Sequence, residues 1–225
     1  MKAILYRSKG PAQCVLSVED IEVQPPGPGE VTVQIEYSGV NPSDTKGRMG
    51  ISSRAMDYPF IGPHHDGAGV IHSVGAGVPV NVIDQRVWLH LAQWQRQYGT
   101  AAEFVTLPFE RTVLLGPNVS TLVGASIGIP LITAYHAVFS SGDLKGRRVL
   151  VTGGAGSVGL YALQLAKCAG AMVAATVSSR EKGAVALEAG ADAVVNYKEA
   201  DWVPTLKSST GDRGFDLRFF RLSCG

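Results

Sequence analysis

The chain has 225 residues, of which 45% are hydrophobic, and it carries a formal net charge of +1. This length and composition suit one large or two small soluble domains with a hydrophobic core. No run of like charge suggests a nucleic acid or an anionic membrane surface as a partner. We also expect no apolar run of transmembrane length and no secretory signal. The three cysteines are odd in number and far apart, so a disulfide framework is excluded and a reducing, cytoplasmic compartment is the expected location.

The first half of the chain has the pattern of a β-rich module. Apolar and polar residues alternate over 31–37, which is the period of a half-buried strand. Glycine and proline breaks separate further expected strands at 2–6, 69–75, 86–90 and 102–107. We therefore expect a partly open β-barrel, followed by a helical segment at 120–140 that links it to the second half.

The most informative feature of the sequence is a strand that runs directly into a glycine turn. Residues 148–152 are expected to form a buried strand, and a helix is expected over 160–169. Between them, Gly154, Gly156 and Gly159 have the G-x-G-x-x-G spacing of a dinucleotide-binding turn. In that pattern the glycines allow a tight turn, close approach of the backbone to a pyrophosphate, and close packing of helix on strand. The helix N-terminus then offers free N–H groups to the phosphates.

The segments that follow repeat the alternation of strand and helix. A second strand is expected at 171–177, and a helix follows in which Ser178 and Glu181 are spaced as a capping box. Gly190 is placed to end that helix, and a third strand is expected at 193–197. This order predicts an α/β fold with a doubly wound parallel sheet.

The end of the second strand distinguishes NAD from NADP. A free ribose 2′-hydroxyl is usually bound by an acidic residue about 20 residues past the turn, but no acidic residue lies between Gly154 and Arg180. Ser178, Arg180 and Lys182 stand there instead and suit a 2′-phosphate. We therefore expect NADPH as the cofactor.

Longer stretches resemble the zinc-independent quinone oxidoreductase (zeta-crystallin-like) branch of the medium-chain dehydrogenase/reductase superfamily. They are residues 38–45, 66–75, 129–135 and the glycine turn, and the resemblance covers nearly all of residues 1–216. It implies a GroES-like β-barrel domain at 1–120, a linking helix at 121–140 and a Rossmann domain at 141–225. It also implies NADPH bound between the domains, and a homodimer.

The resemblance also assigns site residues. It places the cofactor pyrophosphate against the turn that begins at Gly154 and continues through Ala155, Gly156, Ser157, Val158 and Gly159. It places the adenosine 2′-phosphate near Ser178, Lys182 and Tyr197. The residues expected to line the nicotinamide cleft are Asn41, Asp44 and Thr133. Lys46 stands where several members carry a tyrosine that touches cofactor or substrate, and a lysine there can still reach a phosphate or a carbonyl.

No metal site is expected from these residues. Zinc members of the superfamily use a cysteine near the position of Asn41 and a histidine that precedes an acidic residue. The His65-Asp66 pair matches only the second of these features. A catalytic zinc usually has three protein ligands, and no Cys/His cluster supplies them. The alternative that His64 and His65 are metal ligands stays open.

The resemblance implies that a hydride passes from NADPH to a quinone or a conjugated carbonyl, with Asn41 or Lys46 hydrogen-bonded to the acceptor oxygen. Two alternatives remain: an enoyl or enal reductase on the same fold, and a truncated, non-catalytic nucleotide-binding form. The second arises because a fourth strand begins near residue 215 but charged residues follow at 218 and 221, and the later strands of a Rossmann domain are absent. We therefore expect a C-terminally truncated Rossmann sheet with an exposed edge at its fourth strand.

Overall fold

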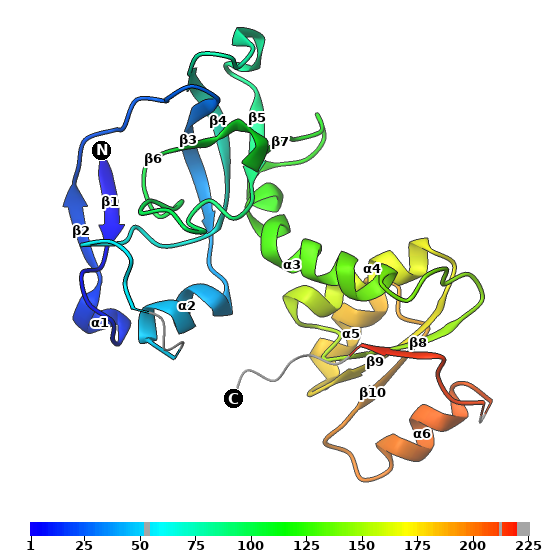
Figure 1. The fold of residues 1–225 in the computed structure, drawn as a ribbon. Helices are drawn as coiled ribbons and strands as arrows, with labels where there is room; N and C mark the ends of the chain where they lie inside the picture. The colour runs from blue at the N-terminus through cyan, green and yellow to red at the C-terminus, as the bar shows by residue number, and fades with distance from the viewer. Residues whose placement is uncertain (52–54, 212, 220–225) are drawn as a thin grey trace. The chain divides into compact units, whose positions relative to one another are not determined.

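The computed structural model describes residues 1–51, 55–211 and 213–219, and it divides into two compact units (Figure 1). The first unit is Met1–Ile129 and the second is Pro130–Gly225. The boundary falls inside helix α3 (Thr121–Phe139), which therefore contributes residues to both units.

The first unit is built on an antiparallel five-stranded sheet in the order β6-β3-β4-β5-β7. Its strands are β3 (Glu30–Gly39), β4 (Asp66–Val74), β5 (Arg86–Leu89), β6 (Phe104–Pro108) and β7 (Thr112–Leu114). A separate hairpin pairs β1 (Lys2–Leu5) with β2 (Ser17–Asp20). The short helices are α1 (Ala12–Val15), α2 (Pro42–Met49), η1 (Val80–Val82) and η2 (Phe109–Arg111). Aliphatic side chains from four strands of the sheet fill its core, and these include Val31, Val33, Ile71, Val87 and Leu107.

Strand β3 departs from the simple alternation that its sequence predicts. Its pairing with β4 shifts register between Thr32 and Val33 and again between Ile35 and Tyr37. Because each shift changes which face the following side chains occupy, Tyr37 is 46% exposed although it continues the apolar series. The strand itself was predicted correctly, and Val31, Val33 and Ile35 of its apolar series pack in the core, but Tyr37 does not.

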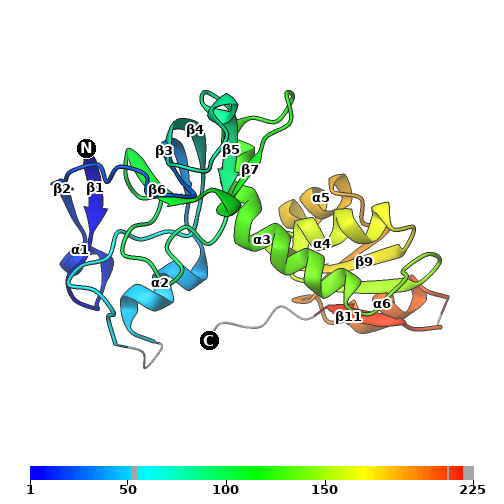
Figure 2. The ribbon, with the colours of Figure 1, turned by 45° about the horizontal axis from the view of Figure 1, so that its top comes forward.

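The second unit contains a parallel four-stranded sheet in the order β10-β9-β8-β11. The strands are β8 (Arg148–Thr152), β9 (Met172–Val177), β10 (Ala193–Asn196) and β11 (Leu217–Phe219). Helices α4 (Ser157–Cys168) and α5 (Arg180–Glu188) lie on one face of the sheet, and α6 (Trp202–Ser208) covers the other, as Figure 2 shows. This is the strand order of the first half of a Rossmann fold, so the predicted doubly wound sheet is confirmed.

Two helix starts differ from prediction. Helix α4 begins at Ser157, three residues before the expected start, because Gly156 is already its N-cap. The cap of α5 is Ser179 and not Ser178: the Ser179 hydroxyl accepts the backbone N–H of Lys182 at 3.3 Å. The predicted cap was therefore wrong by one residue: β9 ends at Val177 and Ser178 lies in the bend that precedes the cap. Gly190, with φ +103°, follows the last turn of α5 as predicted.

The fourth strand forms as predicted and pairs in parallel with β8. Arg148 fixes Asp216, the residue directly before β11. The Arg148 backbone N–H and guanidinium both donate to the Asp216 carboxylate, at 2.7 and 2.8 Å. Among the described strands, β11 lies at the edge of the sheet. The tail at 220–225, on which part of the truncation hypothesis rested, lies outside the described residues.

The expectation that no apolar segment reaches transmembrane length was wrong. Helix α3 has 19 residues and a mean hydropathy of 1.6 over its most apolar stretch, so by length and composition alone it is long enough to span a bilayer. However, Ala134 and Val138 of this helix are fully buried in the core of the second unit. One third of the apolar stretch is buried, so the helix packs along only part of its surface.

Candidate functional site

The glycine turn between β8 and α4 is folded tightly against the neighbouring strand. The backbone N–H of Gly154 donates to Thr176 O at 3.0 Å, and that of Gly153 donates to Thr176 Oγ1 at 3.2 Å. Gly153 has φ +68°, which a residue with a side chain rarely adopts. A bond from Gly156 N to Gly153 O at 2.9 Å then closes the turn. The turn is therefore fixed by hydrogen bonds to the backbone and the side chain of Thr176 on β9.

The three glycines of the motif have different surroundings. A Cβ at Gly154 would lie 2.7 Å from Ala175 Cβ, and a Cβ at Gly159 would lie 2.4 Å from Gly153 O. Real Cβ atoms do not come so close, so both glycines serve the packing of turn, helix and strand. A Cβ at Gly156 would meet its nearest neighbour, Gly153 O, at 3.3 Å, which the chain can nearly accommodate. Gly156 is therefore the glycine whose absent side chain chiefly benefits a ligand.

The N-terminus of α4 presents unpaired backbone donors beside this turn. No side chain caps the helix, and its first turn contains no acidic residue. Ser157 and Val158 are exposed there. Because the first N–H groups of a helix have no intrahelical acceptor and the dipole is positive at this end, the arrangement suits a phosphate group.

The end of β9 and the start of α5 carry positive charge. Lys182 Nζ donates to Ser178 Oγ at 3.1 Å, and Arg180 is exposed beside them. Tyr197, directly after β10, is 47% exposed. The structure thus brings the predicted 2′-phosphate residues to the carboxyl ends of adjacent parallel strands, which is where open α/β sheets bind their ligands.

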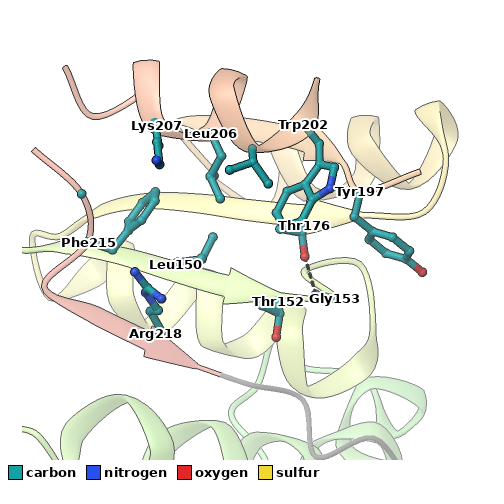
Figure 3. A pocket seen from close by; sticks show the side chains of 12 residues that line it. Leu150, Thr152, Gly153, Thr176, Tyr197, Trp202, Leu206, Lys207, Phe215 and Arg218 are labelled. Atoms are coloured by element: carbon teal, nitrogen blue, oxygen red, sulfur yellow. Dashed lines mark hydrogen bonds between the residues drawn. The ribbon is translucent and has the colours of Figure 1, made fainter. Parts of the chain in front are cut away.

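A pocket of about 610 Å³ opens between α6 and the sheet of the second unit, next to the glycine turn (Figure 3). Apolar side chains, among them Leu150, Trp202, Leu206 and Phe215, form most of its wall. Polar atoms gather at its two ends. Figure 3 shows the Thr152 and Thr176 hydroxyls near the turn, and the Lys207 and Arg218 cations at the opposite end. The sequence analysis had identified Tyr197 among the lining residues but not the pocket itself, because its apolar wall and its polar ends come from segments that only the fold brings together.

A second group of residues lies in the first unit, around the N-terminus of α2. Asn41 is the N-cap of α2 and is 6% exposed. Its backbone N–H donates to Asp44 Oδ2 at 2.7 Å, and its side-chain Nδ2 donates to Asp66 Oδ2 at 2.7 Å. His65 Nε2 lies 3.8 Å from Asp44 Oδ1. The structure thus joins the predicted Asn41 and Asp44 to His65 and Asp66, which the sequence analysis had considered only in connection with a metal.

Burial shifts the pKa of each titratable member of this group. It raises the pKa of Asp44 to about 6, since hydrogen bonds from the Asn41 and His65 backbones offset only part of the desolvation. It lowers the pKa of His65 to about 4 and also raises the pKa of Asp66. Near pH 5, therefore, both Asp44 and His65 are mostly uncharged, and their 3.8 Å approach is not an ion pair.

The other two residues predicted for the nicotinamide cleft lie outside this cluster. Lys46 is on α2, two residues beyond Asp44, and is partly buried. Thr133 is an exposed residue of α3 that belongs to the second unit. Their predicted roles stay predictions.

The described residues contain no group of three or more His, Cys, Asp or Glu side chains arranged to hold a metal ion. His64 Nδ1 lies 2.9 Å from Ser38 Oγ, and His65 Nδ1 is buried without a hydrogen-bond partner in the described part of the chain. The two adjacent histidines are thus in different environments.

Two family models match the chain. Residues 27–117 match the alcohol dehydrogenase GroES-like domain, and residues 157–220 match the zinc-binding dehydrogenase family. Rat (Rattus norvegicus) quinone oxidoreductase is 35% identical over 218 residues, which are 96% of this chain and 65% of the rat protein. The human (Homo sapiens) quinone oxidoreductase is 32% identical over the same share of each chain.

Solved structures agree with these matches. The crystal structure of an NAD-dependent alcohol dehydrogenase superposes with a TM-score of 0.90 at 30% identity, covering 97% of this chain and 70% of that one. Escherichia coli quinone oxidoreductase complexed with NADPH superposes with a TM-score of 0.81 at 28% identity, covering 96% and 64%.

The fold and these matches define the class: the chain belongs to the medium-chain dehydrogenase/reductase superfamily, with a GroES-like unit and a Rossmann-type unit. Within it, the chain belongs to the quinone oxidoreductase branch. It spans about two thirds of the length of the relatives that it matches, 65% for the rat protein.

Proposed function

We propose that this chain is an NADPH-dependent oxidoreductase that reduces a quinone or a conjugated carbonyl without zinc, in the cytoplasm and as a homodimer. The observation that carries the proposal is the glycine turn at the end of β8, where Gly156 and the uncapped start of α4 form a cradle for a pyrophosphate. The quinone oxidoreductases among its relatives and the NADPH complex of the E. coli enzyme support the activity and the cofactor.

Different residues of the second unit bind different parts of the cofactor. The backbone N–H groups of Ser157 and Val158 bind the pyrophosphate, and Ala155 borders it. Lys182, Arg180 and Ser178 bind the 2′-phosphate, with Tyr197 beside them. No acidic residue stands at the end of β9 to hydrogen-bond a free 2′-hydroxyl, so NADPH is preferred over NADH.

Bound NADPH would supply the hydride for the reaction. In the first unit, Asn41 or Lys46 donates a hydrogen bond to the acceptor oxygen as negative charge develops on it. Asp44 of the first unit and Thr133 of the second contact the bound reactants, and the proton that completes the reduction comes from water. No Lewis acid is required in this scheme because a quinone is already electrophilic.

The first test is NADPH oxidation by the 225-residue chain with an ortho-quinone, compared with NADH and with a conjugated enone as the acceptor. We expect turnover with NADPH, little with NADH, and a large loss of NADPH preference in Lys182→Ala. The matched control is Lys145→Ala, an exposed lysine on a turn of the same unit. Turnover with the enone but not the quinone would assign the chain to enone reduction, and equal rates with both cofactors would contradict the assignment of Lys182.

A further inference from the structure

The side chain of Asp66 is a buried carboxylate whose only described side-chain partner is Asn41. Asp66 is the first residue of β4 and is 1% exposed. Its Oδ2 accepts two hydrogen bonds, from Asn41 Nδ2 at 2.7 Å and from the backbone N–H of Ile129 at 2.8 Å. Burying a carboxylate costs free energy unless it is well hydrogen-bonded, so a residue of this kind at this position calls for a specific role.

Asp66 connects three segments that are distant in sequence. Asn41 caps α2, Asp66 begins β4, and Ile129 lies in the middle of α3 next to Pro130. The helix can reach the carboxylate only because residue 128 is glycine: a Cβ there would lie 2.2 Å from Asp66 Oδ1. The packing of α3 is thus shaped around the Asp66 carboxylate.

The contact also determines which way the Asn41 amide faces. Asp66 Oδ2 accepts a hydrogen bond from Asn41 Nδ2, so the nitrogen of the amide, and not its oxygen, faces Asp66. The Asn41 backbone N–H is held as well, by Asp44 Oδ2 at 2.7 Å. With both its backbone and its side chain fixed, Asn41 has one orientation available.

We propose that Asp66 is a positioning residue that fixes the side-chain amide of Asn41 and anchors it to α3 through the backbone of Ile129. The functional part of this inference rests on the proposed function, in which Asn41 hydrogen-bonds the acceptor oxygen. The role of Asp66 is then to keep one amide orientation in place before the acceptor binds, so that no reorganisation is needed during the reaction.

The test is the isosteric variant Asp66→Asn, which keeps the shape of the side chain but replaces one acceptor oxygen by a donor. Its control is Asp216→Asn in the second unit, because Asp216 also accepts one backbone and one side-chain hydrogen bond, both from Arg148. Both variants are compared with the wild-type chain by ¹⁵N NMR of the side-chain amides without cofactor. The Asn41 resonances are identified by their loss in Asn41→Asp. NADPH affinity and steady-state kinetics follow on the same proteins.

In Asp66→Asn we expect the Asn41 side-chain resonances to move, and kcat with a quinone to fall by about tenfold to a hundredfold at unchanged NADPH affinity. Asp216→Asn should leave the Asn41 resonances in place. Asn41 resonances that stay unchanged in Asp66→Asn overturn the proposal, as does a kcat that remains at the wild-type level. If the wild-type chain reduces no acceptor, the proposed function fails, but the NMR result still shows whether Asp66 holds Asn41.

Should Asp66→Asn not fold, the wild-type chain provides a second measurement. A fixed and buried Asn41 amide must exchange its Nδ2 protons with solvent much more slowly than the exposed Asn118. Equal exchange rates for the two amides would refute the positioning role.

Discussion

At the scale of single residues, Asp44 and His65 respond oppositely to the same buried surroundings. Burial disfavours the charged form of each, so it raises the pKa of the acid to about 6 and lowers the pKa of the base to about 4. Between about pH 4 and pH 6, Asp44 is therefore protonated in the folded state but ionised in the unfolded chain. Over the same range His65 is neutral in the folded state but protonated in the unfolded chain. The two effects on stability oppose each other between about pH 4 and pH 6.

For Asp44 we predict a stability cost that grows with pH. Between pH 3.8, the ordinary pKa of an aspartate, and pH 6, the folded state binds more protons than the unfolded state, so the free energy of unfolding falls as pH rises. Asp44→Asn removes this dependence, and relative to wild type it should gain on the order of 2 kcal/mol between pH 4 and pH 7. Urea unfolding at several pH values measures the difference, and parallel pH profiles for the two proteins would contradict it.

His65→Gln should have the opposite effect and serves as the matched comparison. The pKa of His65 is about 4 in the folded state against an ordinary value of 6.5, so the wild-type protein gains stability as pH rises through this window. The glutamine variant lacks that gain but keeps the opposing effect of Asp44. As pH rises from 4 to 6.5, its free energy of unfolding should therefore fall relative to that of the wild-type protein. The same urea series measures it. If both variants change the pH profile in the same direction, desolvation is not the cause of the shifts.

At the scale of elements, the turn between β8 and α4 contains one glycine required for packing, Gly159, and one that leaves space for a ligand, Gly156. An added Cβ at Gly159 collides with Gly153 O at 2.4 Å, whereas one at Gly156 meets that same atom at 3.3 Å. We predict that Gly159→Ala lowers the free energy of unfolding by about 1–3 kcal/mol. Gly156→Ala should cost only about 0.5 kcal/mol, since alanine is a poorer N-cap than glycine, but weaken NADPH binding about tenfold, because its methyl group occupies space that the pyrophosphate needs. Thermal unfolding and fluorescence titration measure the two effects. Equal losses of stability would show that both glycines serve packing alone.

Helices α2 and α3 offer a similar comparison between two helical glycines of the first unit. Gly128→Ala places a Cβ 2.2 Å from Asp66 Oδ1, so the helix or the carboxylate must move, and we predict a loss of about 2 kcal/mol or more. Gly47→Ala in α2 meets no atom within 4 Å and should be neutral or stabilising by about 0.5 kcal/mol, because alanine favours the helix. Chemical denaturation of both variants provides the test. A Gly128→Ala protein as stable as wild type would show that α3 does not pack against Asp66.

These elements also show what local sequence could reveal. Strands β8, β9 and β10 were predicted to within one residue, because buried parallel strands are continuously apolar and glycine marks their ends. The register shifts of β3 and the pocket under α6 were missed, since both depend on neighbours distant in sequence. For the same reason the contact of Asn41 with Asp66, 25 residues away, was not predicted, although each residue had been noted separately.

At the scale of the whole molecule, the described residues form one hydrophobic core in the first unit and two in the second. One core is formed by the strands of the five-stranded sheet, and two others lie on the opposite faces of the parallel sheet. Every residue that we assign to cofactor binding by the glycine turn and by the ends of β9 and β10 belongs to the second unit. The cofactor should therefore stabilise the two units unequally.

Tryptophan fluorescence can report on each unit. Trp88 and Trp94 lie in the first unit and Trp202 in the second, so Trp202→Phe reports on the first unit alone, and the double variant Trp88→Phe/Trp94→Phe reports on the second.

NADP⁺ at about a hundredfold over its Kd should add about 2.7 kcal/mol to the free energy of unfolding of the unit that binds it. We predict a higher urea midpoint for the Trp202 probe, a smaller or no shift for the first-unit probes, and no shift with NAD⁺. Equal shifts would mean that the units unfold as one cooperative block. No shift of the Trp202 probe with NADP⁺ would contradict cofactor binding by the turn after β8.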